Sequence, residues 1–230
     1  MAPDAGVFQS QLITTYLARS RHPLSTTCTR SGRCDHHPPH TSGLSCGGGG
    51  IEGGGHIRCR SELLPLLESV LGHFDLPVLV AGGIGDGRAF AEVLAAGAAG
   101  ARAGTRFVAT NESGAHPAYK QAVAGATAGS TEITGAFSVC PLCATEPRAR
   151  VLRSCIDALG DLPGDTVGEA TVGGERISLP KGHGLPPGAT ATGHISAMPM
   201  YAGESAAAVH AVEPVAEVVK SWCATADEPS

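Results

Sequence analysis

The sequence has few aromatic residues, no long apolar run and no excess of positive charge. Only 4% of its 230 residues are aromatic, and no stretch reaches the roughly 18 apolar residues that a membrane-spanning helix needs. The formal net charge of −5 disfavours nucleic acid or an anionic membrane as a partner. The first 20 residues also lack the basic start and apolar block of a secretory signal peptide. We therefore expect a cytoplasmic protein with no nucleic-acid partner, no membrane segment and reduced cysteines.

Cysteine and histidine occur without a standard metal-binding pattern. The segment 28–46 contains three cysteines and three histidines, but it lacks the closely spaced cysteine pair of structural zinc sites. Cys140 and Cys143 form one such pair, without the second pair that a zinc site needs. We predict no metal site, and we expect residues 1–48 to form an irregular or disordered N-terminus, because they show no apolar period.

A βαβ unit is the clearest structural signal in the sequence. The short apolar run Val78–Ala81 predicts a buried strand of a parallel sheet. Asp86 is a good N-cap for the following helix, and Gly97 fits the position just beyond its end. Residues 99–103 predict a second strand. The apolar side chains of the helix fall on one face: Phe90, Val93 and Leu94.

Each of these two strands is followed by glycine. Gly82 and Gly83 follow the first strand, and Gly104 and Thr105 follow the second. Glycine turns expose backbone N–H groups, which bind phosphate. Two such turns after successive strands can hold one phosphate between them, as at the last strands of (β/α)₈ barrels. The alternative is that each glycine makes a tight turn and binds nothing.

The remaining elements continue the alternation of helices and strands. We expect a strand at 130–137, loop with a hairpin near Gly173 at 160–192, and helices at 63–74, 117–123, 148–159 and 205–222. Pro214 lies inside the last helix, so it should kink or split that helix. Helix and strand alternating in this way predict an α/β fold with a parallel sheet and right-handed crossovers.

His56 is a candidate catalytic base. It ends the glycine-dense segment 47–55, where the backbone can pass close to a ligand. The ordinary histidine pKa of about 6.5 suits proton abstraction near neutral pH. The alternative is a histidine on a solvated loop.

Four blocks of the sequence resemble the nitronate monooxygenase (2-nitropropane dioxygenase) family of FMN-dependent (β/α)₈ barrels. These blocks are GIEGGGH (50–56), LPVLVAGGIGDGR (76–88), AGTRFVATNESGAHPAYK (103–120) and AMPMYAGES (197–205). The resemblance implies an α/β, TIM-type (β/α)₈ barrel that is incomplete and lacks its first strands. It also implies FMN-binding βα units at 49–159 and a loop-rich C-terminal segment with a terminal helix at 160–230.

The resemblance also implies roles for individual residues. His56 matches the base that removes the α-proton of a nitroalkane. Arg102 and Glu204 stand where the family commonly has glutamine. The positions that match FMN contacts are Gly54, the first turn Gly82 and Gly83, and the second turn Arg102, Ala103, Gly104 and Thr105. The implied reaction oxidises a small nitronate or nitroalkane to a carbonyl compound and nitrite, with FMN as cofactor and O₂ as oxidant.

Two other functions remain open on the sequence. The first is an FMN-dependent enoyl-ACP reductase of the same barrel family, which shares these blocks and would need NAD(P)H. The second is an inactive truncated chain. An incomplete barrel has open sheet edges, which a second copy of the chain would cover in a homo-oligomer.

Overall fold

The computed structural model describes residues 15–18, 27–28, 44–46, 52–56, 61–73, 76–139 and 148–227. Cys140, Cys143 and most of the segment 1–48 lie outside these residues, so the predictions made for them stay predictions. Within the described parts of the chain, no three histidine, cysteine or acidic side chains are grouped as metal ligands would be. No helix there is both long and apolar enough to span a membrane.

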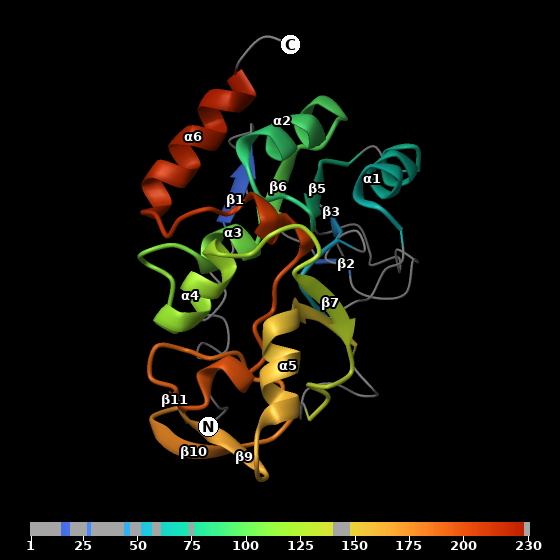
Figure 1. Ribbon diagram of the computed structural model, residues 1–230. Helices are drawn as coiled ribbons and strands as arrows, with labels where there is room; N and C mark the ends of the chain where they lie inside the picture. Colours follow the sequence, from blue (N-terminus) through green and yellow to red (C-terminus); the bar gives the residue numbers. More distant parts are fainter. Residues whose placement is uncertain are drawn as a thin grey trace, which may run out of the picture.

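A five-stranded sheet contains the predicted βαβ unit (Figure 1). Strands β5 (Val78–Ala81) and β6 (Gly100–Ala103) are parallel neighbours joined by helix α2 (Gly87–Ala95). The strand β3 (Leu44–Cys46) lies parallel to β5, and β2 (Thr27–Cys28) lies parallel to β3. The other edge is β1 (Thr15–Ala18), which runs antiparallel to β6. The predicted α/β class is confirmed, and the sheet is parallel as predicted except at β1.

Local sequence signals explain how α2 begins and ends. Asp86 accepts a hydrogen bond from the Ala89 N–H at 2.8 Å, as an N-cap does. After the helix, Gly97 adopts a φ of +100°, which residues with a side chain rarely adopt. Helix α1 (Leu63–Leu71) precedes β5 and buries Leu67 and Val70. Both helices follow the predicted apolar periodicity.

The second half of the chain adds two smaller sheets. The first has the order β4-β8-β7, made of β4 (Gly55–His56), β7 (Thr131–Thr134) and β8 (Ala149–Leu152). The second consists of β9 (Thr166–Val172), β10 (Glu175–Pro180) and β11 (Thr192–Gly193). The helices here are α3 (Thr105–Val108), α4 (Pro117–Ala124), α5 (Arg153–Asp161), the 3₁₀ turns η1 (Ile195–Ala197) and η2 (Glu204–Ala208), and α6 (Val215–Asp227).

One expectation for this half needs correction, and two are confirmed in their main feature. The predicted helix at 148–159 begins as strand β8, whose four residues are all buried, and only then becomes α5; a short apolar run cannot separate the two by periodicity. The hairpin predicted near Gly173 is present, because β9 and β10 pair antiparallel across Gly173–Gly174, and much of the rest of 160–192 is loop, as predicted. The predicted helix at 205–222 is split at Pro214 as expected, since α6 begins directly after it and runs on to Asp227; the part before Pro214 forms only the 3₁₀ turn η2.

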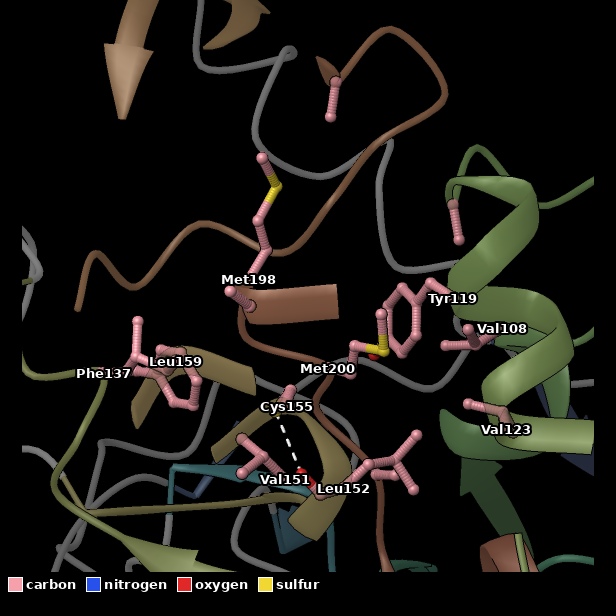
Figure 2. Packing of buried hydrophobic residues seen from close by; sticks show 14 of the residues in the cluster. Val108, Tyr119, Val123, Phe137, Val151, Leu152, Cys155, Leu159, Met198 and Met200 are labelled. Carbon is pink, nitrogen blue, oxygen red and sulfur yellow. Dashed lines mark hydrogen bonds between the residues drawn. The ribbon is translucent and has the colours of Figure 1, made fainter. Parts of the chain in front are cut away.

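The described side chains form two apolar cores. The first lies around β5 and β6, under α1, α2 and α6, and contains Trp222 stacked on Phe90 with ring centroids 5.8 Å apart. The second joins α4, α5, β8 and β9 (Figure 2) and contains Phe137, Val151, Cys155 and Met198. Phe107 belongs to the first core and Val108 to the second, so helix α3 connects them.

The strands of the described residues form three separate sheets rather than one closed barrel. Strands β5 and β6 determine where the two glycine turns of the site lie. The register pairs Ala81 of β5 with Arg102 of β6, and the two strands are parallel. The turns that follow them therefore lie at the same edge of the sheet.

Candidate functional site

The first glycine turn has the backbone geometry that the sequence predicts. Gly82 and Gly83 have φ values of +94° and +71°, a conformation that glycine adopts without steric cost. A Cβ on Gly83 would lie 3.4 Å from the Cβ of Glu52. The turn is therefore both left-handed and closely covered by the segment before His56. Whether its N–H groups hold phosphate stays a prediction.

The second turn is open where the first is covered. Gly104 is exposed, and no heavy atom lies within 4 Å of where its Cβ would be. The Gly104 carbonyl accepts hydrogen bonds from the N–H groups of Phe107 and Val108 at 2.9 and 3.0 Å, so the residue starts helix α3. Buried Thr105 accepts the N–H of Gly203 at 2.9 Å through its hydroxyl oxygen. The turn thus has open space next to Gly104, whereas the Thr105 side chain is held by its hydrogen bond to Gly203.

The segment 52–55 packs directly against residues 202–204. A Cβ on Gly54 would lie 2.6 Å from the Gly203 backbone nitrogen, and a Cβ on Gly203 would lie 2.6 Å from the Glu52 carbonyl oxygen. The same Glu52 oxygen accepts the N–H of Glu204 at 2.8 Å. Neither glycine can carry a side chain here. This close approach explains Gly54 without a ligand, so its predicted contact with FMN stays a prediction.

His56 lies on a short strand that β8 holds in place. The Cα atoms of His56 and Ala149 are partners in an antiparallel pair, and so are those of Gly55 and Arg150. The structure describes the His56 backbone, while its imidazole lies outside the described atoms. Its backbone is therefore held by β8, directly after the segment 52–55, and its role as a base stays a prediction.

A buried arginine crosses from β8 to the 202–204 segment. The Arg150 guanidinium forms an ion pair with Glu204 at 2.9 Å and donates to the Thr131 hydroxyl at 3.2 Å. Its carbonyl accepts the N–H of Ala202 at 3.3 Å. Arg150 is 8% exposed, whereas the Glu204 side chain is about half exposed, so water screens the pair on the glutamate side and the buried guanidinium joins β8 to residues 202–204. The sequence resemblance marked Glu204 as unusual but gave no signal for its partner.

Four chain segments thus meet at one edge of the parallel sheet. They are residues 52–56, the turn at Gly82–Gly83, the turn at 103–105 and residues 202–204. The contacts that join them run from Gly83 to Glu52, from Glu52 to Glu204, and from Gly203 to Thr105. Every residue predicted for the site except Arg102 lies in the first three segments. Arg102 lies on β6 opposite Ala81, next to the second turn.

Two features of these residues fit a bound cofactor, and the identity of that cofactor stays a prediction. The place where a Cβ of Gly104 would be is open space. One carboxylate oxygen of Glu52, Oε2, is buried and has no hydrogen-bond partner among the described residues. A buried polar atom without a partner costs free energy unless a ligand or water satisfies it. In the sequence, the one weak signal for Glu52 is that it is the one charged residue in the glycine-dense segment 47–55.

Comparison with known proteins gives the site a family. Residues 48–225 match the nitronate monooxygenase family model. A nitronate monooxygenase of Paraburkholderia phytofirmans is 33% identical over 178 residues, which cover 74% of this chain and 45% of that protein. A (3aS,4S,5R,7aS)-5-hydroxy-7a-methyl-1-oxo-octahydro-1H-indene-4-carboxyl-CoA dehydrogenase of Rhodococcus jostii is 55% identical over 64 residues, which cover 28% of this chain and 18% of that protein.

The fold comparison agrees with the sequence comparison. The structure of nitroalkane oxidase from Streptomyces ansochromogenes matches with a TM-score of 0.57 and 29% identity, over 81% of this chain and 52% of that chain. In each of these comparisons the chain spans about half or less of the known protein. The family model nevertheless covers well over half of this chain, and the chain therefore belongs to the nitronate monooxygenase family.

Proposed function

We propose that this chain binds FMN and oxidises alkyl nitronates to a carbonyl compound and nitrite, with O₂ as oxidant. The observation that supports this most is the convergence of two glycine turns and the His56 strand at one sheet edge. Family membership and the match to a nitroalkane oxidase point the same way. The products and the use of O₂ follow from the family and belong to the proposal.

The proposed phosphate site consists of backbone N–H groups from both turns. Gly82 and Gly83 would bind one side of the phosphate, and Ala103 and Gly104 the other, with Arg102 and Thr105 adjacent. Gly54 would lie nearer the isoalloxazine ring, since it precedes the His56 strand. FMN, when bound, supplies an acceptor for two electrons from the substrate and passes them to O₂.

We propose that His56 is the base that removes a proton from the substrate. A neutral nitroalkane carries an acidic hydrogen on the carbon next to the nitro group, and the imidazole would abstract it to leave the nitronate. Pairing with β8 fixes the His56 backbone, which favours a defined orientation towards substrate.

We further propose that β5, α2 and β6 are consecutive units of a TIM-type (β/α)₈ barrel. Two phosphate turns after consecutive parallel strands are typical of such barrels, and the nitroalkane oxidase match supports the same fold family.

The first test is a visible absorption spectrum of the purified chain with added FMN. Binding should shift and sharpen the flavin bands, and an anaerobic nitronate should bleach them until air is admitted. A chain that leaves the spectrum of free FMN unchanged would contradict the proposal at its first step.

His56→Ala separates proton abstraction from electron transfer. Turnover of a neutral nitroalkane should fall about 100-fold or more, whereas turnover of the pre-formed nitronate and the affinity for FMN should change little. Steady-state assays with both substrate forms make the comparison. Loss of FMN from the variant would instead give His56 a structural role.

A second candidate is reduction or oxidation of a thioester-linked substrate. The Rhodococcus relative, 55% identical over 64 residues, is named a carboxyl-CoA dehydrogenase, and the enoyl-ACP reductase alternative also concerns a thioester. Consumption of NAD(P)H with an enoyl thioester, and none with a nitronate, would favour this candidate.

A further inference from the structure

We infer that the Glu52 carboxylate accepts a hydrogen bond from a hydroxyl group of the ribityl chain of the bound flavin. The inference rests on the proposed function, because it concerns the same site. It adds a contact that neither the glycine turns nor the sequence resemblance supplies.

The position of Glu52 brings its side chain to the first glycine turn. Its Cβ and Cγ lie 3.4 and 3.9 Å from the place where a Cβ of Gly83 would be. Its own carbonyl is held by the N–H of Glu204 at 2.8 Å. The backbone of Glu52 is therefore fixed against 202–204, and the first two carbons of its side chain pack against the turn at Gly83.

The Glu52 carboxylate lacks a hydrogen-bond donor at one of its oxygens. Oε2 is buried without a hydrogen-bond partner among the described residues, and an ionised carboxylate can only accept hydrogen bonds. A buried acceptor left without a donor has lost its hydrogen bonds to water without replacing them, which destabilises the folded chain. A molecule that brings a donor to this point would recover that loss.

The groups that FMN carries near its phosphate indicate which of them donates a hydrogen bond to Glu52. Phosphate oxygens at the glycine turn are acceptors and would repel a carboxylate. The ribityl chain begins next to the phosphate and presents three hydroxyl groups, which can donate. The Glu52 carboxylate lies one carbon further from the turn than Cγ, so it suits a ribityl hydroxyl better than the phosphate proposed for the turn itself.

Three flavins that differ only in this chain test the inference. FMN carries phosphate and hydroxyls, riboflavin carries hydroxyls only, and lumiflavin carries neither. Their dissociation constants can be measured by quenching of flavin fluorescence for the wild-type chain, Glu52→Ala and Glu52→Gln. Glu92→Ala, which removes an exposed glutamate on α2, is the matched control.

The expected result is selective. Glu52→Ala should weaken riboflavin about tenfold or more and weaken FMN as well, but leave lumiflavin unchanged. Glu52→Gln keeps an acceptor oxygen and should retain much of the riboflavin affinity. Unchanged riboflavin binding in Glu52→Ala would overturn the inference, and tighter FMN with unchanged riboflavin would show that Glu52 faces the phosphate.

Failure of the proposed function gives a different outcome. A wild-type chain that binds none of the three flavins would overturn both the function and the inference. Far-ultraviolet circular dichroism of each variant separates lost binding from lost folding, and Glu52→Gln, which preserves size and shape, keeps the test decisive if Glu52→Ala unfolds.

Discussion

At the scale of single residues, the glycines of the site differ in what a side chain would disturb. A Cβ on Gly54 would collide with the backbone of Ala202 and Gly203, and Gly83 adopts a left-handed conformation. Substitution at either position strains the fold as well as the site. Gly104 has an ordinary φ of −110° and open space around it. It can therefore report on ligand binding alone.

Gly104→Val should weaken FMN binding at least tenfold and leave the free energy of unfolding nearly unchanged. The new side chain takes up space that the proposed phosphate would need, and its Cβ has no heavy atom within 4 Å. FMN titration and urea unfolding measure the two quantities. Gly160→Val in α5, which is equally open, is the control, and an unchanged FMN affinity for Gly104→Val would refute the phosphate assignment.

His183 should make the fold sensitive to mild acid. Burial lowers its pKa to about 4, whereas the unfolded chain keeps the ordinary value of about 6.5. As the pH falls through this window the unfolded state binds the proton first, so stability decreases. The loss between pH 7 and pH 5 should be roughly 1–2 kcal/mol.

His183→Asn tests this expectation by urea unfolding at both pH values. Asparagine cannot titrate, but it keeps an acceptor for the Leu185 N–H that His183 Nδ1 now receives at 3.1 Å. The variant should lose less stability than the wild type on acidification. The exposed His210→Asn should behave like the wild type; equal pH dependence in all three chains would show that His183 does not titrate in this window.

At the scale of elements, α2 and α6 approach more closely than side chains would allow. A Cβ on Gly87 would lie 2.9 Å from the Cβ of Thr225 and 3.1 Å from the Cα of Trp222, and Figure 1 shows the two helices side by side. Trp222 fills the space between Phe90 and Phe107, with centroid distances of 5.8 and 5.7 Å. The close contact lets one aromatic side chain seal the first core.

Gly87→Ala should destabilise the chain by about 1–2 kcal/mol, since the added methyl group pushes α6 away. Replacing a glycine inside a helix by alanine usually raises the free energy of unfolding by roughly 0.5–1 kcal/mol. Gly160→Ala in α5, with nothing within 4 Å, should show that ordinary gain. Urea unfolding followed by the fluorescence of Trp222 measures both, and a stabilised Gly87→Ala would mean that the helices are less tightly packed than described.

The elements that could be predicted from sequence are those whose local signals agree. The helix α2 has a capping residue, an apolar face and a terminal glycine, and it occurs as expected. Strand β8 could not be predicted, because its central place in the sheet depends on β4, which is distant in sequence, as well as on the preceding β7. The site divides in the same way: the glycine turns are local signals, whereas the contacts of Glu52 and Arg150 arise only when residues 202–204 return to them.

At the scale of the whole molecule, the proposed site draws on both apolar cores. The turn at Gly82–Gly83 follows β5 of the first core. Residues 202–204 adjoin the second core through Ala202 and Ala206. A ligand that bridges these segments should stabilise the two cores together, because unfolding either one would remove part of its binding site.

FMN at about 100 times its dissociation constant should raise the free energy of unfolding by about 2.7 kcal/mol. Thermal melts followed by Trp222 fluorescence, which reports on the first core, and by far-ultraviolet circular dichroism should shift upward together. Gly104→Val should show a smaller shift at the same FMN concentration. A shift in only one of the two signals would mean that the ligand contacts only one core.

The four residues of α3 should tolerate few substitutions, because each is buried and makes a specific contact. Thr105 receives the N–H of Gly203, and Arg106 pairs with Glu213. Phe107 and Val108 fill different cores, and all four residues are at most 8% exposed. A library that randomises these codons should therefore yield very few folded chains, whereas the same library at the exposed residues 175–178 of β10 should yield many. This short helix limits how far related sequences can diverge.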